Sequence, residues 1–97
     1  MLTTTVTKRI RDVLQELNLK EIPQFRVEMA PEGFGELATN AAFLASKELR
    51  KPPREVADII VEKLSGDPLF EKCETAGPGF VNFWISWKVY TDVVMIL

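Results

Sequence analysis

A Gly-Pro-Gly turn between two runs of strand-forming residues constrains the fold of this chain more than any other feature. Residues 70–76 and 80–86 are strand-like, the second run is rich in aromatic and β-branched side chains, and Gly77-Pro78-Gly79 separates them. Glycine and proline in so short a connection are typical of the turn in a β-hairpin. The sequence therefore predicts two antiparallel strands in the last third of the chain.

The second strand of this hairpin has two faces of different composition. Strand side chains alternate between faces. Its core face comprises Val81, Phe83 and Ile85, and its other face comprises Phe80, Asn82 and Trp84. Aromatic rings that stack on a base, with an amide that hydrogen-bonds the base edge, are typical of RNA recognition. Spacing alone favours a simpler interpretation, in which the rings pack beneath a helix, the amide caps a turn and the glycines only shape that turn.

The first half of the chain predicts two helices and one strand. Apolar residues recur at spacings of three and four in residues 6–17, which is typical of an amphipathic helix. Residues 25–29 alternate between apolar and polar and predict a half-buried strand. Residues 30–35 hold one proline and two glycines and predict a loop. The alanine-rich segment 36–49 has neither residue type and predicts a second helix.

A third helix follows a proline pair. The Lys51-Pro52-Pro53 step ends the preceding helix, because a residue before proline avoids helical geometry, whereas Pro53 suits the first turn of a new helix. An apolar stripe in residues 56–64 completes that helix, and residues 65–68 end it. The predicted order is α-β-α-α-β-β-α, which indicates an α+β domain with a small antiparallel β-sheet covered by helices.

The C-terminal segment is more apolar than one face of a helix can bury. Its apolar residues after Trp87 are Val89, Tyr90, Val93, Val94, Ile96 and Leu97. We therefore divide the chain into a domain of residues 1–86 and an apolar segment of residues 87–97, and expect something beyond residue 97 to cover that segment. One function class that follows is a protein-interaction or assembly module that docks through this segment, with the Phe80 face buried.

Composition excludes several other classes. The chain has no histidine, which excludes Ser-His-Asp and Cys-His catalysis and every imidazole metal site. Twelve Lys plus Arg against 14 Asp plus Glu give a net charge of -2, which excludes a histone-like polyanion binder. The lone Cys73 allows no intramolecular disulfide or thiolate cluster and indicates a reducing, cytoplasmic location. No apolar run reaches the roughly 18 residues of a membrane span, so we expect no metal and no membrane partner.

A basic cluster falls at the junction between the second and third helices. It consists of Lys47, Arg50, Lys51 and Arg54, with two glutamates among them. Such side chains can contact phosphates. Taken alone, a cluster of this kind is more often a solvated corner of the protein.

Three separate segments of the chain carry a resemblance to a known family. They are GELATNAA at residues 35–42, KPPREVA at 51–57 and AGPGFVNF at 76–83. In order and spacing these segments resemble the N-terminal additional domain of class I arginyl-tRNA synthetases, over most of residues 1–86. The family usually has Gly-Asp and an aromatic residue where this chain has Gly35-Glu36-Leu37, and a residue other than proline in place of Pro52.

The resemblance implies a tRNA-binding module that precedes a catalytic Rossmann domain and contacts the D-loop corner of tRNA(Arg). Carried over to this hairpin, the aromatic and amide residues that meet a D-loop base are Phe80 and Asn82. We expect Gly79 and Trp84 to belong to the same tRNA-binding site. The family's His-Ile-Gly-His-like and Lys-Met-Ser-Lys-Ser-like signatures are absent. We therefore expect no catalysis and no cofactor in these 97 residues, with arginine–tRNA ligase activity and ATP belonging to a longer parent chain. The expected partners are tRNA(Arg) and the catalytic domain of that parent.

Overall fold

Four helices and four strands follow one another in the computed structural model, which describes the backbone of residues 2–96 and the side chains of residues 2–92. In chain order they are α1 (Leu2–Glu16), β1 (Val27–Met29), β2 (Leu37–Thr39), α2 (Ala41–Leu49), α3 (Pro53–Leu64), β3 (Phe70–Ala76), β4 (Phe80–Ile85) and α4 (Trp87–Ile96). The predicted α+β class and the predicted succession of elements are confirmed, with one short strand added.

The strands form one antiparallel sheet in the order β1-β2-β4-β3. The predicted hairpin is confirmed, because Ala76 pairs with Phe80 on either side of the Gly77–Gly79 turn. The long strands β3 and β4 provide most of the sheet, and β1 and β2 extend it by three residues each. β4 is therefore an interior strand with neighbours on both sides.

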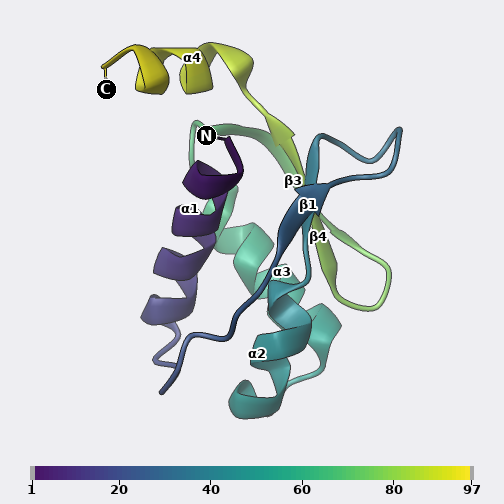
Figure 1. Ribbon diagram of the computed structural model, residues 1–97. Helices are drawn as coiled ribbons and strands as arrows, with labels where there is room; N and C mark the ends of the chain where they lie inside the picture. Colours follow the sequence, from purple (N-terminus) through teal and green to yellow (C-terminus); the bar gives the residue numbers. More distant parts are fainter. Residues whose placement is uncertain (1, 97) are drawn as a thin grey trace.

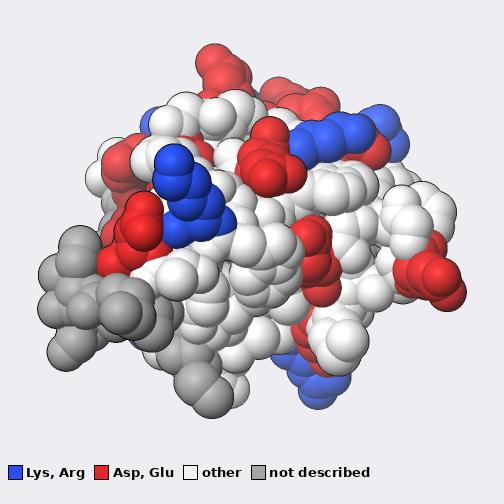
Figure 2. Space-filling view, turned by 90° about the horizontal axis from the view of Figure 1, so that it is seen from above, with Lys and Arg blue, Asp and Glu red and all other residues white. Residues whose placement is uncertain are grey.

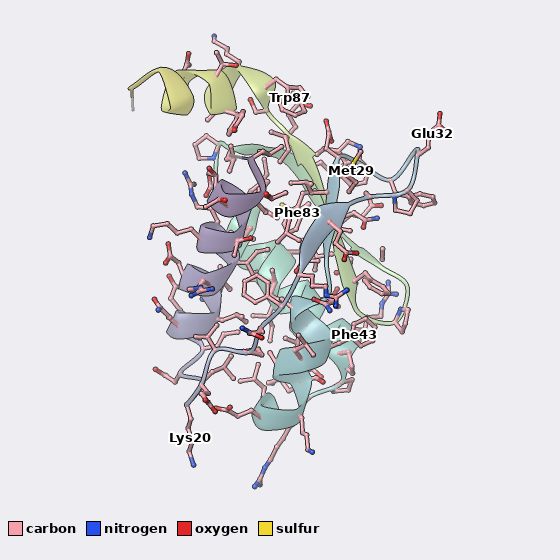
Figure 3. The ribbon with its side chains drawn as sticks, in the orientation of Figure 1. Lys20, Met29, Glu32, Phe43, Phe83 and Trp87 are labelled. Carbon is pink, nitrogen blue, oxygen red and sulfur yellow. The ribbon has the colours of Figure 1, made fainter. Side chains whose placement is uncertain are left out.

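Helices α1, α2 and α3 lie on one side of the sheet and leave its other face open (Figure 1). The core lies between them and includes Ile10 of α1, Ile60 of α3 and Phe83 of β4, all with no exposed surface. Figure 3 shows Phe83 between the sheet and the helices. Its ring centroid is 4.9 Å from that of Phe70. Side-chain alternation in β4 therefore places one set of residues in the core and the other on the open face.

The expectation that residues 36–49 form a single helix is wrong at its N-terminal end. Leu37–Thr39 is the strand β2, hydrogen-bonded to β1 on one side and to β4 on the other. The Thr39 hydroxyl donates to the Arg26 carbonyl oxygen at 2.7 Å and accepts from the Ala41 N–H at 3.2 Å, where α2 begins. Pairing with two strands outweighs the weak helix preference of three residues, since propensity contributes only tenths of a kcal/mol each.

The predicted break between the second and third helices is confirmed. Arg50 has a left-handed backbone conformation (φ 55°), and the next N–H, that of Lys51, returns to the Ser46 carbonyl oxygen at 3.2 Å. Pro53 then occupies the first position of α3. This junction holds α2 and α3 against each other next to the β3–β4 turn.

The C-terminal helix α4 extends away from the sheet, beyond the N-terminal end of α1 (Figure 1). Trp87 is 51% exposed, whereas Tyr90 packs against the edge of the core. The predicted exposure of Val93, Val94, Ile96 and Leu97 concerns side chains outside the described residues. No helix within residues 2–96 is both long enough and apolar enough to cross a membrane.

Candidate nucleic-acid interface

The open face of the sheet contains a concave pocket of about 480 Å³. Ala38 of β2 and Asn82 of β4 are paired in the register of the two strands, and both line this pocket. Glu28 of β1 stands in the same row, opposite Ala38. The methyl group of Ala38 is small, so the row is hollow between Glu28 and Asn82. The pocket therefore follows from a small residue on an interior strand.

Asn82 is an almost fully buried polar side chain of the pocket. Only 4% of its surface is exposed, although it lies on the face that the helices leave open. Among the described residues, none hydrogen-bonds to the Asn82 side chain. A carboxamide offers two N–H donors and one carbonyl acceptor. Its hydrogen-bonding capacity is therefore available to a ligand in the pocket.

Phe80 lines the same pocket and is 43% exposed. Its ring meets the ring of Phe43 of α2 edge to face, with centroids 4.9 Å apart. Packing against a helix was part of the simpler interpretation of this residue. The Phe43 contact holds one side of the ring and leaves the rest of its surface free for stacking.

The β3–β4 turn is held by the N-terminal end of α3. A Cβ atom on Gly79 would lie 2.7 Å from the Cβ of Pro53, so only glycine fits there without movement of the backbone. Nη1 of Arg54 donates to the Gly77 carbonyl oxygen at 2.7 Å. These two contacts fix the turn, and with it the start of β4 where Phe80 lies.

Trp84 shares a face with Phe80 and Asn82, as the alternation predicts, but it does not line the pocket. The ammonium of Lys72 lies 4.6 Å from the centroid of the Trp84 ring. On its other side, a Cβ added to Gly35 would lie 3.0 Å from the ring. The indole is therefore half-buried between a strand and a loop, and the structure brings together only Phe80 and Asn82 of the predicted platform.

The four predicted phosphate contacts, Lys47, Arg50, Lys51 and Arg54, are all exposed. The ammonium of Lys51 lies 3.4 Å from a carboxylate oxygen of Glu55. Arg54 is committed to the turn. Lys47 and Arg50 therefore have the freest cationic groups of the cluster.

Several pocket residues were not singled out from the sequence. Phe34 of the β1–β2 loop lines the pocket with 53% of its surface exposed. Asn40 also lines it and accepts the Arg26 backbone N–H at 2.8 Å, which leaves the donors of its amide free. The sequence signal that could have identified Phe34 is a large aromatic residue in a loop that contains glycine and proline. Local loop structure does not require an aromatic residue at such a position.

Charges of both signs are mixed on the face seen from above. In the view of Figure 2, Lys and Arg side chains lie next to Asp and Glu side chains, and neither sign forms a continuous patch. Within the described residues, no three His, Cys, Asp or Glu side chains are placed to hold a metal ion. The charges on this face therefore do not form a strong positive field.

Cys73 of β3 is half-buried on the core side of the sheet, opposite Phe83. Burial, assisted by the negative charge of Asp67, raises the pKa of the thiol from 9.0 to about 12. The thiol therefore stays protonated and unreactive at neutral pH, as expected for a structural cysteine.

Comparison with known proteins gives consistent matches along almost the whole chain. Residues 4–85 match the model of the arginyl tRNA synthetase N terminal domain. An arginine–tRNA ligase of Thermotoga petrophila is 41% identical over 95 residues, which are 97% of this chain and 17% of that protein. A second, from Citrifermentans bemidjiense, is 49% identical over 73 residues, 70% of this chain and 13% of that protein.

Two solved structures share the fold. An arginyl-tRNA synthetase of Thermus thermophilus superimposes with a TM-score of 0.74 at 24% identity, over 96% of this chain and 15% of the other. That of Plasmodium falciparum gives a TM-score of 0.79 at 20% identity, over 95% of this chain and 17% of the other. At these identities the superpositions establish the fold alone.

The fold and the matches place this chain among the accessory domains of aminoacyl-tRNA synthetases. Within that class, it belongs to the family of arginyl-tRNA synthetase N-terminal domains. The family inferred from residues 35–42, 51–57 and 76–83 is thereby confirmed. The chain spans about a sixth of the length of the curated relatives it matches.

Proposed function

We propose that this domain binds tRNA(Arg) at its D-loop corner on behalf of a longer arginine–tRNA ligase. In this proposal Phe80 stacks on a D-loop base and Asn82 hydrogen-bonds the edge of that base. One observation carries the proposal: the Asn82 amide lines a pocket at 4% exposure, beside a half-exposed aromatic ring and without a hydrogen-bond partner among the described residues.

The chemistry of this amide favours a base edge as its ligand. The Asn82 side chain lines the pocket and has no hydrogen-bond partner among the described residues, so its donors and acceptor can pair with a ligand there. A nucleobase edge presents donors and acceptors side by side, which a carboxamide can pair with in two hydrogen bonds. The adjoining ring provides a flat apolar surface for the face of the same base. Phe80 and Asn82 together therefore match both the face and the edge of a base.

Arginine activation and ATP binding take place outside this domain in the proposed enzyme. The chain spans 17% of the Thermotoga petrophila relative, and it contains neither catalytic signature of the family. The domain's contribution is to position the tRNA relative to the remainder of the enzyme. Exposed Lys47 and Arg50 are the cations best placed to contact tRNA phosphates in addition.

The test is a titration of the 97-residue chain with a tRNA(Arg) transcript, followed by NMR of the Asn82 side-chain amide. We expect weak binding, because a net charge of -2 supplies little phosphate attraction. The Asn82 amide signals should nonetheless shift more than those of Asn18, which lies away from the pocket. A transcript without its D-arm is the control. Equal shifts with both transcripts would contradict the proposal, and submicromolar binding at physiological salt would contradict the expected weak affinity.

A second candidate function is docking through the C-terminal segment. The observation that favours it is Trp87, an aromatic side chain 51% exposed at the start of a helix that extends away from the sheet. In a longer chain this surface would pack against the catalytic domain. Trp87 does not line the pocket, so the two functions are compatible.

A further inference from the structure

The pocket on the open sheet face has a second aromatic residue that the contact with one base does not use. Phe34 comes from the loop between β1 and β2, far in sequence from Phe80, yet both rings line the same pocket. More than half of the Phe34 side chain is exposed. Met29 and Pro31 line the same end of the pocket, so this end is apolar.

The loop that presents Phe34 has a defined conformation. Ala30 N–H donates to the Glu36 carbonyl oxygen at 3.1 Å, which closes the base of the loop. Glu36 N–H donates to the Phe83 carbonyl oxygen at 2.9 Å, which fixes the loop to β4. Gly35 has a φ of 89°, and a Cβ there would lie 2.6 Å from that same oxygen. An aromatic ring on a fixed loop leaves apolar surface in contact with water and contributes little to folding. Such a residue is typical of a binding site.

The two aromatic residues are attached to the sheet at different points along β4. The loop joins β4 at the level of Phe83, three residues along the strand from Phe80. At ~3.3 Å per residue, the two attachment points are about 10 Å apart. Two consecutive nucleotides of an extended strand can span this spacing, with one base beside each ring. The pocket volume of about 480 Å³ also falls in the range of sites for ligands larger than one base.

We propose that the pocket binds two consecutive nucleotides, with the first base stacked on Phe80 and the neighbouring base against Phe34. This inference rests on the proposed tRNA-binding function and extends it with a second subsite. Asn82 then reads the first base only, and the second base is held by stacking, without hydrogen-bond readout. The pocket is therefore selective at one position and tolerant at the next.

The test compares a mononucleotide with a dinucleotide as NMR probes of the 97-residue chain. The probes are 5′-AMP and the dinucleotide ApA, titrated into the unaltered chain and into Phe34→Ala, Phe80→Ala and Leu44→Ala. Leu44 is an exposed apolar residue of α2 that does not line this pocket, so its variant is the matched control. Loss of one base stack should weaken binding about fivefold or more.

The expected pattern separates the two subsites. Phe80→Ala should weaken both probes, Phe34→Ala should weaken ApA about fivefold or more and leave 5′-AMP unchanged, and Leu44→Ala should change neither. Phe34→Tyr keeps an aromatic ring at this position and should therefore bind ApA as the unaltered chain does. Equal losses for both probes in Phe34→Ala, no loss for either, or no ApA binding by the unaltered chain would overturn the second subsite. The proposed function has its own test, and it fails if Phe80→Ala leaves tRNA binding unchanged.

Discussion

Substitutions at three consecutive positions of β4 test the proposed recognition of a base. In an enzyme chain that contains this domain, Phe80→Ala and Asn82→Ala should weaken productive use of tRNA. Val81→Ala should instead lower thermal stability, because its side chain has no exposed surface and faces the core. Adjacent side chains of a strand lie on opposite faces. One strand therefore provides both the test variants and their control.

The magnitudes follow from what each side chain contacts. Loss of a base stack costs about 1 to 3 kcal/mol, and loss of an amide that reads a base edge costs about the same. Phe80→Ala also loses the edge-to-face contact with Phe43, worth about 0.5 to 1.5 kcal/mol of folding free energy. Asn82→Ala removes no hydrogen bond within the described part of the chain, so its effect on folding should be close to zero.

The control substitution acts on the fold. Val81→Ala removes two buried methyl groups, worth about 1.6 kcal/mol in transfer free energy alone, and leaves a cavity that adds to this cost. At about 4 to 8 °C per kcal/mol for a domain of this size, the midpoint of unfolding should fall by roughly 6 to 13 °C or more. Its tRNA kinetics should be unchanged at temperatures where it remains folded.

The assay pairs steady-state aminoacylation at varied tRNA concentration with thermal unfolding followed by circular dichroism. The expected result is a five- to 150-fold fall in kcat/KM for tRNA in Phe80→Ala and Asn82→Ala, the equivalent of about 1 to 3 kcal/mol. Unfolding of both variants, with unchanged tRNA kinetics in the molecules that remain folded, would refute the recognition argument. The two side chains would then serve packing alone.

Four further predictions concern the framework, the charges, the thiol and catalysis. Gly79→Ala should destabilise the domain by about 1 to 3 kcal/mol in urea unfolding, because the added Cβ overlaps the start of α3. Gly66→Ala, where a Cβ meets nothing within 4 Å, should not, and equal losses would contradict this account. Replacing Lys47 and Arg50 by Ala should reduce the slope of log affinity for tRNA against log salt by about 0.7 for each phosphate that the domain no longer neutralises; an unchanged slope would show that they do not bind phosphates. The raised pKa of Cys73 contributes stability that is complete below pH 9.0 and is lost as the pH rises toward about 12. Unfolding measured at pH 8 and at about pH 10.5 should show this loss, and Cys73→Ala should remove that part of it. Finally, the 97-residue chain should show no arginine-dependent pyrophosphate exchange above a buffer control, and any such exchange would place catalytic groups within it.

The hairpin could be predicted from sequence because its signals are local. A Gly-Pro-Gly turn between two strand-like runs determines the pairing, and the side-chain period of two then determines which residues face the core. Strand β2 could not be predicted in the same way. Leu37–Thr39 is three residues long, and its conformation depends on β1 and β4, the second of which lies more than 40 residues away in sequence. Long-range pairing decided this element against its local preference.

The same distinction applies to the site. Phe80 and Asn82 could be placed on one face by alternation alone, whereas the pocket around them could not be foreseen. Its other walls come from β1, β2 and the loop that carries Phe34, which meet β4 only in the folded chain. Trp84 lies on the predicted face of the sheet, but it packs beside Lys72 and Gly35 and does not line the pocket. Alternation predicts which face of the sheet a side chain occupies. It does not predict which other residues lie on that face.

The three sequence segments that resemble the family meet around one strand, and this explains their different compositions. Gly35 of the first segment approaches the β4 backbone where no Cβ fits, and Pro53 of the second packs against Gly79 of the third. These residues fix the start of β4 and the position of the β1–β2 loop beside it. Phe80 and Asn82 then project from a strand whose position the framework has already determined. It follows that substitutions at Gly35, Pro53 or Gly79 should act mainly on unfolding. Those at Phe80 or Asn82 should act mainly on tRNA binding, apart from the folding loss given above for Phe80→Ala. A variant of one group with the phenotype of the other would show that framework and recognition are not separable in this domain.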